Sequence, residues 1–83
     1  MDVVLSRQAV KAMERIQEPV KGRLTAALRK LREDPPQGDI KAMTGQDGFR
    51  LRVGGIRVLF GIIDNTIVVT NILPRGQVYK RRR

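Results

Sequence analysis

The sequence predicts an α+β fold in which an N-terminal strand and a helical hairpin precede an antiparallel β-meander. Three observations lead to this prediction. Residues 3–5 form a short apolar run of strand length, residues 6–34 carry two amphipathic helical patterns, and residues 49–73 read as strands separated by two-residue turns. The expected order is β-α-α-β-β-β, with both helices covering one face of the sheet.

Two helices are expected after the first strand. Ser6 offers a side-chain oxygen to the free N–H groups of a helix start. The apolar face of this first helix consists of Ala9, Val10, Met13 and Ile16. Pro19 suits the first turn of a second helix, and Asp34 should end it because a residue before proline is pushed out of the helical region. The apolar stripe of the second helix consists of Val20, Leu24, Ala27, Leu28 and Leu31.

The second half of the chain is expected to be a loop followed by three strands. Residues 35–48 contain three glycines and few apolar anchors, which predicts a loop. The strands are expected at 49–53, 56–63 and 66–73, with Gly54-Gly55 and Asp64-Asn65 as the hairpin turns between them. Pro74 should stop the last strand, and residues 75–83 form a basic C-terminal tail.

Length and composition restrict the possible functions. The chain has 83 residues, enough for a single domain spanning 1–83, and 41% of them are hydrophobic, as in a folded protein. It contains neither cysteine nor histidine, so disulfides, zinc-finger ligands, a thiol nucleophile and a histidine base are excluded. Its apolar runs are only of strand length and its N-terminus has no signal-peptide pattern, which favours a cytoplasmic protein without a membrane segment.

The net charge of +9, from 17 Lys and Arg against 8 Asp and Glu, is the main functional indication. So strong a basic balance on a small surface favours a nucleic-acid partner or an anionic membrane. A ribosome-associated structural protein, a merely solubilising charge, or an acidic protein partner would also account for it.

The strand register predicts an arginine-bearing face. If Gly54-Gly55 is the turn, Arg52 lies directly across from Arg57, and alternation places Arg50 on the same face. The opposite face collects the expected core residues Phe49, Leu51, Val53, Ile56, Val58, Phe60, Ile62, Ile67 and Val69. The arginine face also collects Leu59, Gly61, Val68 and Ile72, which suggests a shallow groove.

Facing arginines destabilise a sheet, so their presence calls for a functional reason. A phosphate bound among them would provide one, because a guanidinium group matches phosphate oxygens in a bidentate manner. Three solvated arginines that splay apart are the alternative.

The tail adds further candidates. Arg75 follows the last strand and could reach the arginine face. Tyr79 could stack on an unpaired base or bind a ribose hydroxyl, or it could pack against the edge of the core. The remaining RNA-binding candidates, which we expect to contact phosphates without sequence specificity, are Lys80, Arg81, Arg82 and Arg83.

The acidic residues form no paired cluster in the sequence, and none lies in the arginine-bearing strands. Two-metal cleavage of a phosphodiester needs carboxylates that converge on the ions. We therefore expect no metal and no cofactor. Any RNA cleavage should use the 2′-hydroxyl of the RNA as nucleophile, with arginines stabilising the pentavalent phosphate.

Two segments carry a family resemblance. The run from Phe49 to Phe60 (FRLRVGGIRVLF) and the segment from Arg75 to Lys80 (RGQVYK), together with the helical hairpin before them, resemble the RelE/ParE toxin superfamily over nearly the whole chain. The resemblance implies a RelE-like fold and the toxin role in a type II toxin–antitoxin system. Its partners would be a cognate antitoxin, mRNA and the ribosomal A site.

For RelE-type members, the resemblance further implies a ribosome-dependent endoribonuclease that cuts mRNA without metal. The products would be a 2′,3′-cyclic phosphate and a 5′-hydroxyl. By position, Arg50 and Arg52 stand where the family has two basic strand residues, often lysines. Arg57 matches the transition-state arginine, Arg75 the second active-site arginine and Tyr79 the C-terminal tyrosine.

This chain departs from the RelE pattern in its proton-transfer groups. Arginine does not readily act as a base, so the base would be Tyr79, water or ribosomal RNA. Pro74 stands where many relatives carry histidine. Two alternatives therefore stay open: a ParE-like inhibitor of DNA gyrase that does not cleave RNA, and a catalytically inactive nucleic-acid-binding module.

Overall fold

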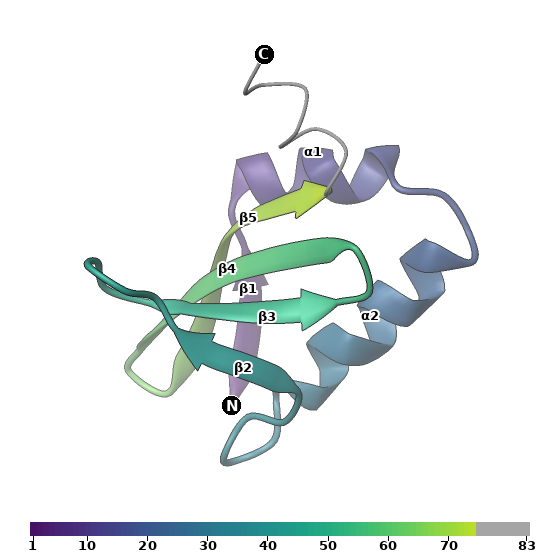
Figure 1. The fold of residues 1–83 in the computed structure, drawn as a ribbon. Coiled ribbons are helices and arrows are strands. Elements are labelled where there is room, and N and C mark those ends of the chain that lie inside the picture. The colour runs from purple at the N-terminus through teal and green to yellow at the C-terminus, as the bar shows by residue number, and fades with distance from the viewer. Residues whose placement is uncertain (75–83) are drawn as a thin grey trace.

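Residues 1–74 fold into two helices and a five-stranded sheet (Figure 1). The computed structural model describes residues 1–74, and residues 75–83 lie outside the described part. The elements in chain order are β1 (Asp2–Leu5), α1 (Arg7–Arg15), α2 (Val20–Lys30), β2 (Asp39–Ala42), β3 (Phe49–Val53), β4 (Ile56–Ile63) and β5 (Thr66–Pro74). The predicted α+β class and the order of its predicted elements are confirmed. Within residues 1–74, no helix is long and apolar enough to cross a membrane.

The sheet has the strand order β1-β5-β4-β3-β2 and is mixed. Strands β2 to β5 form an antiparallel meander, and β1 pairs in parallel with β5. Strand β2 corrects the expectation of a loop over residues 35–48. It escaped the sequence analysis because it is only four residues long and Ile40 is its single core-packed residue, too little for a recognisable alternation.

The helices begin close to where the capping residues predict. Ser6 caps α1: its Oγ accepts a hydrogen bond from the Ala9 N–H at 3.0 Å. Pro19 is the N-cap of α2 rather than a residue of its first turn, so the helix begins at Val20, later than expected. That helix ends at Lys30 rather than at Asp34, because the N–H groups of residues 31–33 donate to carbonyls three residues back and so tighten the chain into successive turns.

The core lies between the helices and one face of the sheet. Figure 1 shows both helices on the same side, with α1 packed against β5 and α2 against β3. The buried residues are Ala9, Leu24, Leu28, Leu31, Leu51, Ile56, Val58, Phe60, Ile67, Val69 and Ile72. Phe49 and Val53 pack against them as expected. Ile62 lies on the predicted face but is 42% exposed.

Because of an irregularity in β5, Ile72 lies on the opposite face of the sheet from the one predicted. Leu59 pairs with Asn71, whereas the next residue, Phe60, pairs with Val69, so Thr70 is an extra residue in β5. Because of the extra residue, the side chains of β5 that follow Thr70 lie on the faces opposite to those that strict alternation predicts. Ile72, expected on the arginine face, is therefore buried in the core, and Asn71 lies across from Leu59 instead. Two hydrogen bonds stabilise the bulge: Thr70 Oγ1 donates to the Leu59 carbonyl, and Ser6 Oγ donates to the Thr70 carbonyl.

Candidate nucleic-acid interface on the open face of the sheet

The open face of the sheet is the face opposite the helices, and it carries the predicted arginines. The register places Arg52 directly across from Arg57, and Arg50 across from Leu59. The predicted placement of the three arginines on one face is therefore confirmed. Arg52 and Arg57 are exposed, whereas Arg50 is half-buried.

The turns that set this register have the backbone that hairpins require. Gly54 has a φ of 58° at the first turn position, and Gly55 is not among the residues with positive φ, as in a type II′ turn. Asp64 and Asn65 both have positive φ, 49° and 60°, as in a type I′ turn. Both turns match the right-handed twist of the strands they join, so the register follows from local chemistry.

Strand β2 adds two charged residues that the sequence analysis missed. Lys41 lies across from Arg50, and Asp39 lies across from Arg52. Ile40, between them, packs against the core, so both charged residues are on the open face. The sequence does contain a signal for these two residues, namely the charged-apolar-charged triplet Asp39-Ile40-Lys41, which is typical of a short strand with one buried face. We call Lys41, Arg50, Arg52 and Arg57 the basic cluster.

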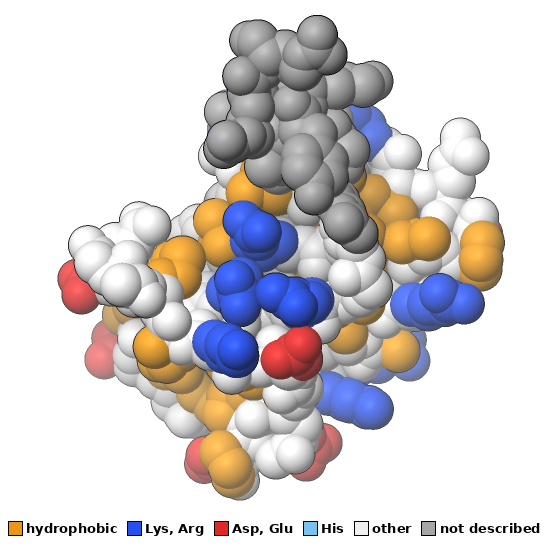
Figure 2. Space-filling model, viewed as in Figure 1, with side chains coloured by type: hydrophobic (Ala, Val, Ile, Leu, Met, Phe, Trp, Pro, Cys, Tyr) orange, Lys and Arg blue, Asp and Glu red, His pale blue; other side chains and the backbone are white. Residues whose placement is uncertain are grey.

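Figure 2 shows basic side chains gathered over the middle of this view, with an acidic side chain against them. Directly opposed residues in an antiparallel pair have Cβ atoms about 4.5–5.5 Å apart, so Arg52 and Arg57 repel each other across the strands. In addition, the Nε atom of Arg50 is buried and has no hydrogen-bond partner within residues 1–74. A buried donor without a partner costs free energy, and an anion over the cluster would relieve the repulsion between Arg52 and Arg57.

The rest of the open face is apolar. Val68 and Leu59 are half-buried, and Val4 and Ile63 are 47% and 61% exposed. The register places Val4 beside Val68, so this apolar part runs from β4 to the β1 edge, away from β2. The open face thus has a basic side and an apolar side.

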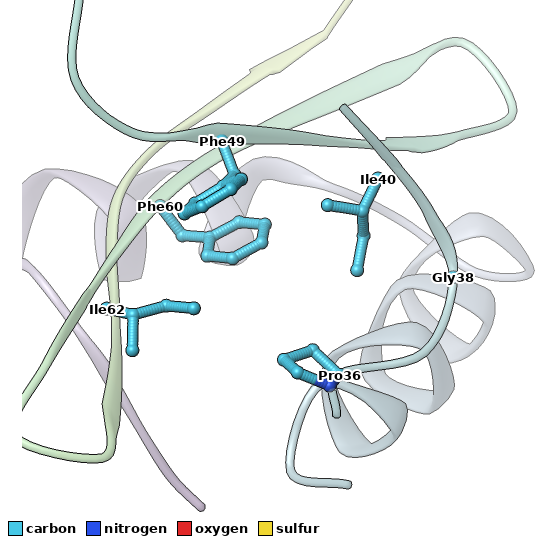
Figure 3. A pocket seen from close by; sticks show the side chains of 6 residues that line it. All are labelled: Pro36, Gly38, Ile40, Phe49, Phe60 and Ile62. Carbon is cyan, nitrogen blue, oxygen red and sulfur yellow. The ribbon is translucent and has the colours of Figure 1, made fainter. Parts of the chain in front are cut away.

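A pocket of about 320 Å³ lies on the helix-bearing face instead. Its lining consists of Pro36, Gly38, Ile40, Phe49, Phe60 and Ile62 (Figure 3). The rings of Phe49 and Phe60 stack there with centroids 5.5 Å apart. No lining residue has a polar side chain, so the pocket offers no side chain for phosphate binding or proton transfer.

The other sequence candidates lie outside the described residues. These are Arg75, Tyr79, Lys80, Arg81, Arg82 and Arg83. Their proposed roles rest on the sequence alone. Among residues 1–74, no three His, Cys, Asp or Glu residues gather in a way that could hold a metal ion.

Comparison with known families identifies the class of protein. Residues 3–79 match the model of the ParE toxin of type II toxin–antitoxin systems, parDE. The chain belongs to this family. It is therefore a toxin of the RelE/ParE superfamily, as the sequence motifs indicated. A search of curated proteins found no match.

Solved structures of RelE toxins share the fold. A chain of the RelB–RelE antitoxin–toxin complex from Methanococcus jannaschii superposes with a TM-score of 0.77 at 19% identity, covering 96% of this toxin and 99% of that chain. The archaeal RelE–RelB complex from Pyrococcus horikoshii gives 0.71 at 27% identity, with coverages of 92% and 96%. The isolated E. coli RelE toxin gives 0.69 at 18% identity, with coverages of 99% and 98%.

Proposed function

We propose that this toxin inhibits translation by cutting mRNA in the ribosomal A site, as an endoribonuclease that requires no metal. The observation that carries the proposal is the basic cluster, in which Arg52 faces Arg57 and the buried Nε of Arg50 lacks a partner within residues 1–74. The facing pair of Arg52 and Arg57 is unfavourable in the free protein and becomes favourable around a phosphate. The RelE fold supports the same function.

The chemistry that suits this cluster is transesterification. The 2′-oxygen of the RNA attacks the adjacent phosphorus, the bond from phosphorus to the 5′-oxygen breaks, and the products are a 2′,3′-cyclic phosphate and a 5′-hydroxyl. Negative charge builds up on the phosphate oxygens in the transition state. Arg57 and Arg52 stabilise that charge, and Arg50 positions the phosphate. In this proposal Arg75 and Tyr79 complete the site from the C-terminal segment.

A cognate antitoxin is the second partner in the proposal. Two of the similar structures are complexes of RelE with RelB. A net charge of +9 favours an acidic antitoxin segment, and the basic cluster is the surface where such a segment would compete with mRNA.

Inhibition of DNA gyrase is the second candidate function, because the matching family model describes ParE toxins. The two functions differ in whether they require the guanidinium group of Arg57. Phosphate chemistry needs its guanidinium, whereas gyrase inhibition needs no cleavage of RNA. Measuring gyrase supercoiling beside mRNA cleavage with the same protein separates them.

Primer extension on an mRNA in a translating extract tests the proposal. We expect the wild type to produce 5′ ends in phase with codons, and Arg57→Ala to abolish them. The matched control is Arg29→Ala, which removes an exposed arginine from α2. If the wild type makes no cut but blocks supercoiling, the gyrase function replaces the proposal. If it binds RNA and does neither, it is an inactive binding module.

A further inference from the structure

The groups of the basic cluster are cations, and in that charged form none of them can accept a proton. Guanidinium groups have five N–H donors and no acceptor, and a lysine ammonium group has three donors and no acceptor. In these charged forms the four residues of the cluster can bind and neutralise a phosphate but do not take the proton of an attacking 2′-hydroxyl. The reaction proposed above leaves that proton unassigned, and this inference rests on that reaction.

Asp39 is the carboxylate that the structure brings to the cluster. It is exposed, it lies directly across from Arg52, and Arg52 in turn lies directly across from Arg57. These three residues form one row across β2, β3 and β4, with the carboxylate at one end. Asp2 is also on the open face, but it belongs to β1 at the opposite edge of the sheet.

The backbone around Asp39 fixes its position. Ile40 packs against the core immediately after it, and Gly38 immediately before it has a φ of 139°, a conformation that other residues rarely adopt. A Cβ atom on Gly38 would lie 2.7 Å from Cδ1 of Leu51, so the chain enters β2 in close contact with β3. Asp39 is thus attached to the packed sheet rather than to a free loop.

We infer that Asp39 is the general base of the cleavage reaction. Its carboxylate takes the proton from the 2′-hydroxyl while the 2′-oxygen forms its bond to the phosphorus that the arginines hold. The bond to the 5′-oxygen breaks, the 5′-oxygen takes a proton from water, and Asp39 returns its proton to solvent. The net transfer is one proton from the 2′-oxygen to the 5′-oxygen.

The competing role for Asp39 is that of a counter-ion for Arg52. The charged groups that face it from β2 and β3 are all cations, namely Lys41, Arg50 and Arg52. The two roles predict opposite effects when the charge is removed. Neutralising a counter-ion makes the face more positive, so it strengthens RNA binding and leaves cleavage unchanged or faster. Removing a base slows cleavage although binding is as strong or stronger.

The test is single-turnover cleavage by saturating toxin on ribosomes that carry mRNA. Asp39→Asn should lower the rate by roughly 100-fold or more, as expected for loss of a general base, while its affinity for the ribosome is unchanged or higher. Asp39→Glu should recover part of the rate because it restores a carboxylate. Asp47→Asn is the matched control, since it removes the same charge from an exposed position in the connection between β2 and β3.

The dependence of the rate on pH distinguishes the base from a positioning group. In the wild type and Asp47→Asn, the rate should fall as the pH is lowered, whereas Asp39→Asn should lose this dependence. Equal rates for Asp39→Asn and the wild type overturn the assignment, and so does a slowed variant that keeps the wild-type pH profile. If the wild type makes no cut, the proposed function itself fails. Circular dichroism of each variant identifies a loss that comes from misfolding.

Discussion

Arg52 and Arg57 face each other across two antiparallel strands, where opposite charges or apolar pairs would be more stable. Around them, Arg50 has a buried Nε without a partner in the described chain, and Lys41 and Asp39 complete the charged side of the open face. The opposed arginines and the buried Nε of Arg50 are unfavourable for the free protein, whereas Asp39 across from Arg52 is a favourable pair of opposite charges. At the scale of single residues, the proposed anion binding accounts for an arginine pair that lowers the stability of the free protein.

The charge repulsion has a measurable consequence. We expect Arg57→Gln to raise the free energy of unfolding by roughly a few tenths of a kcal/mol at low salt, because it removes a like-charge pair while keeping a long polar side chain. The gain should shrink at high salt, where the repulsion is already screened. Urea unfolding at two salt concentrations measures both effects. A variant that is less stable than the wild type at low salt would contradict this reading of the pair.

At the scale of elements, the two hairpin turns determined how much of the strand register could be predicted from the sequence. The register of Arg52 against Arg57 followed from Gly54-Gly55, because a two-residue turn permits only one pairing of the strands. Strand β2 could not be found in the same way, since its four residues have no tight turn beside them. The prediction that Ile72 lies on the arginine face was wrong because no residue type indicates the bulge at Thr70 in the sequence.

The turn between β4 and β5 offers a test of this view. Asn65 has a φ of 60°, a conformation that glycine adopts at lower cost. We expect Asn65→Gly to raise the melting temperature, with a gain in stability of up to about 1 kcal/mol. In contrast, Gly54→Ala should lower stability by about 1–2 kcal/mol because alanine is strained at positive φ. If Asn65→Gly melts at a lower temperature, the turn does not control the register as described.

At the scale of the whole molecule, helices cover one face of the sheet and the other face carries the basic cluster and Asp39. The basic side of that open face lies over β2, β3 and β4, and an apolar side reaches the β1 edge. The fold class and the arginine face were predictable because they depend on short-range alternation and turn chemistry. Lys41 and Asp39 were not, since only the pairing of β2 with β3 brings them to the site.

The net charge predicts how RNA binding responds to salt. Each phosphate contact releases counterions, so the affinity for single-stranded RNA should fall with salt. Arg52→Gln should reduce the slope of log affinity against log salt by about 0.7, the contribution of one contact. Arg29→Gln, on α2 and exposed, is the control and should leave the slope unchanged. Equal slopes for the two variants would place the RNA elsewhere on the surface.

In the proposed reaction, the RNA's own 2′-hydroxyl attacks a phosphate held by the basic cluster. Ribosomes carrying an mRNA with a single 2′-deoxynucleotide at the position of the cut test this step. We expect the unmodified message to be cut to a 2′,3′-cyclic phosphate and a 5′-hydroxyl, and the deoxy message to stay intact while the toxin still binds the ribosome. Cleavage of the deoxy message at the same position would contradict this mechanism.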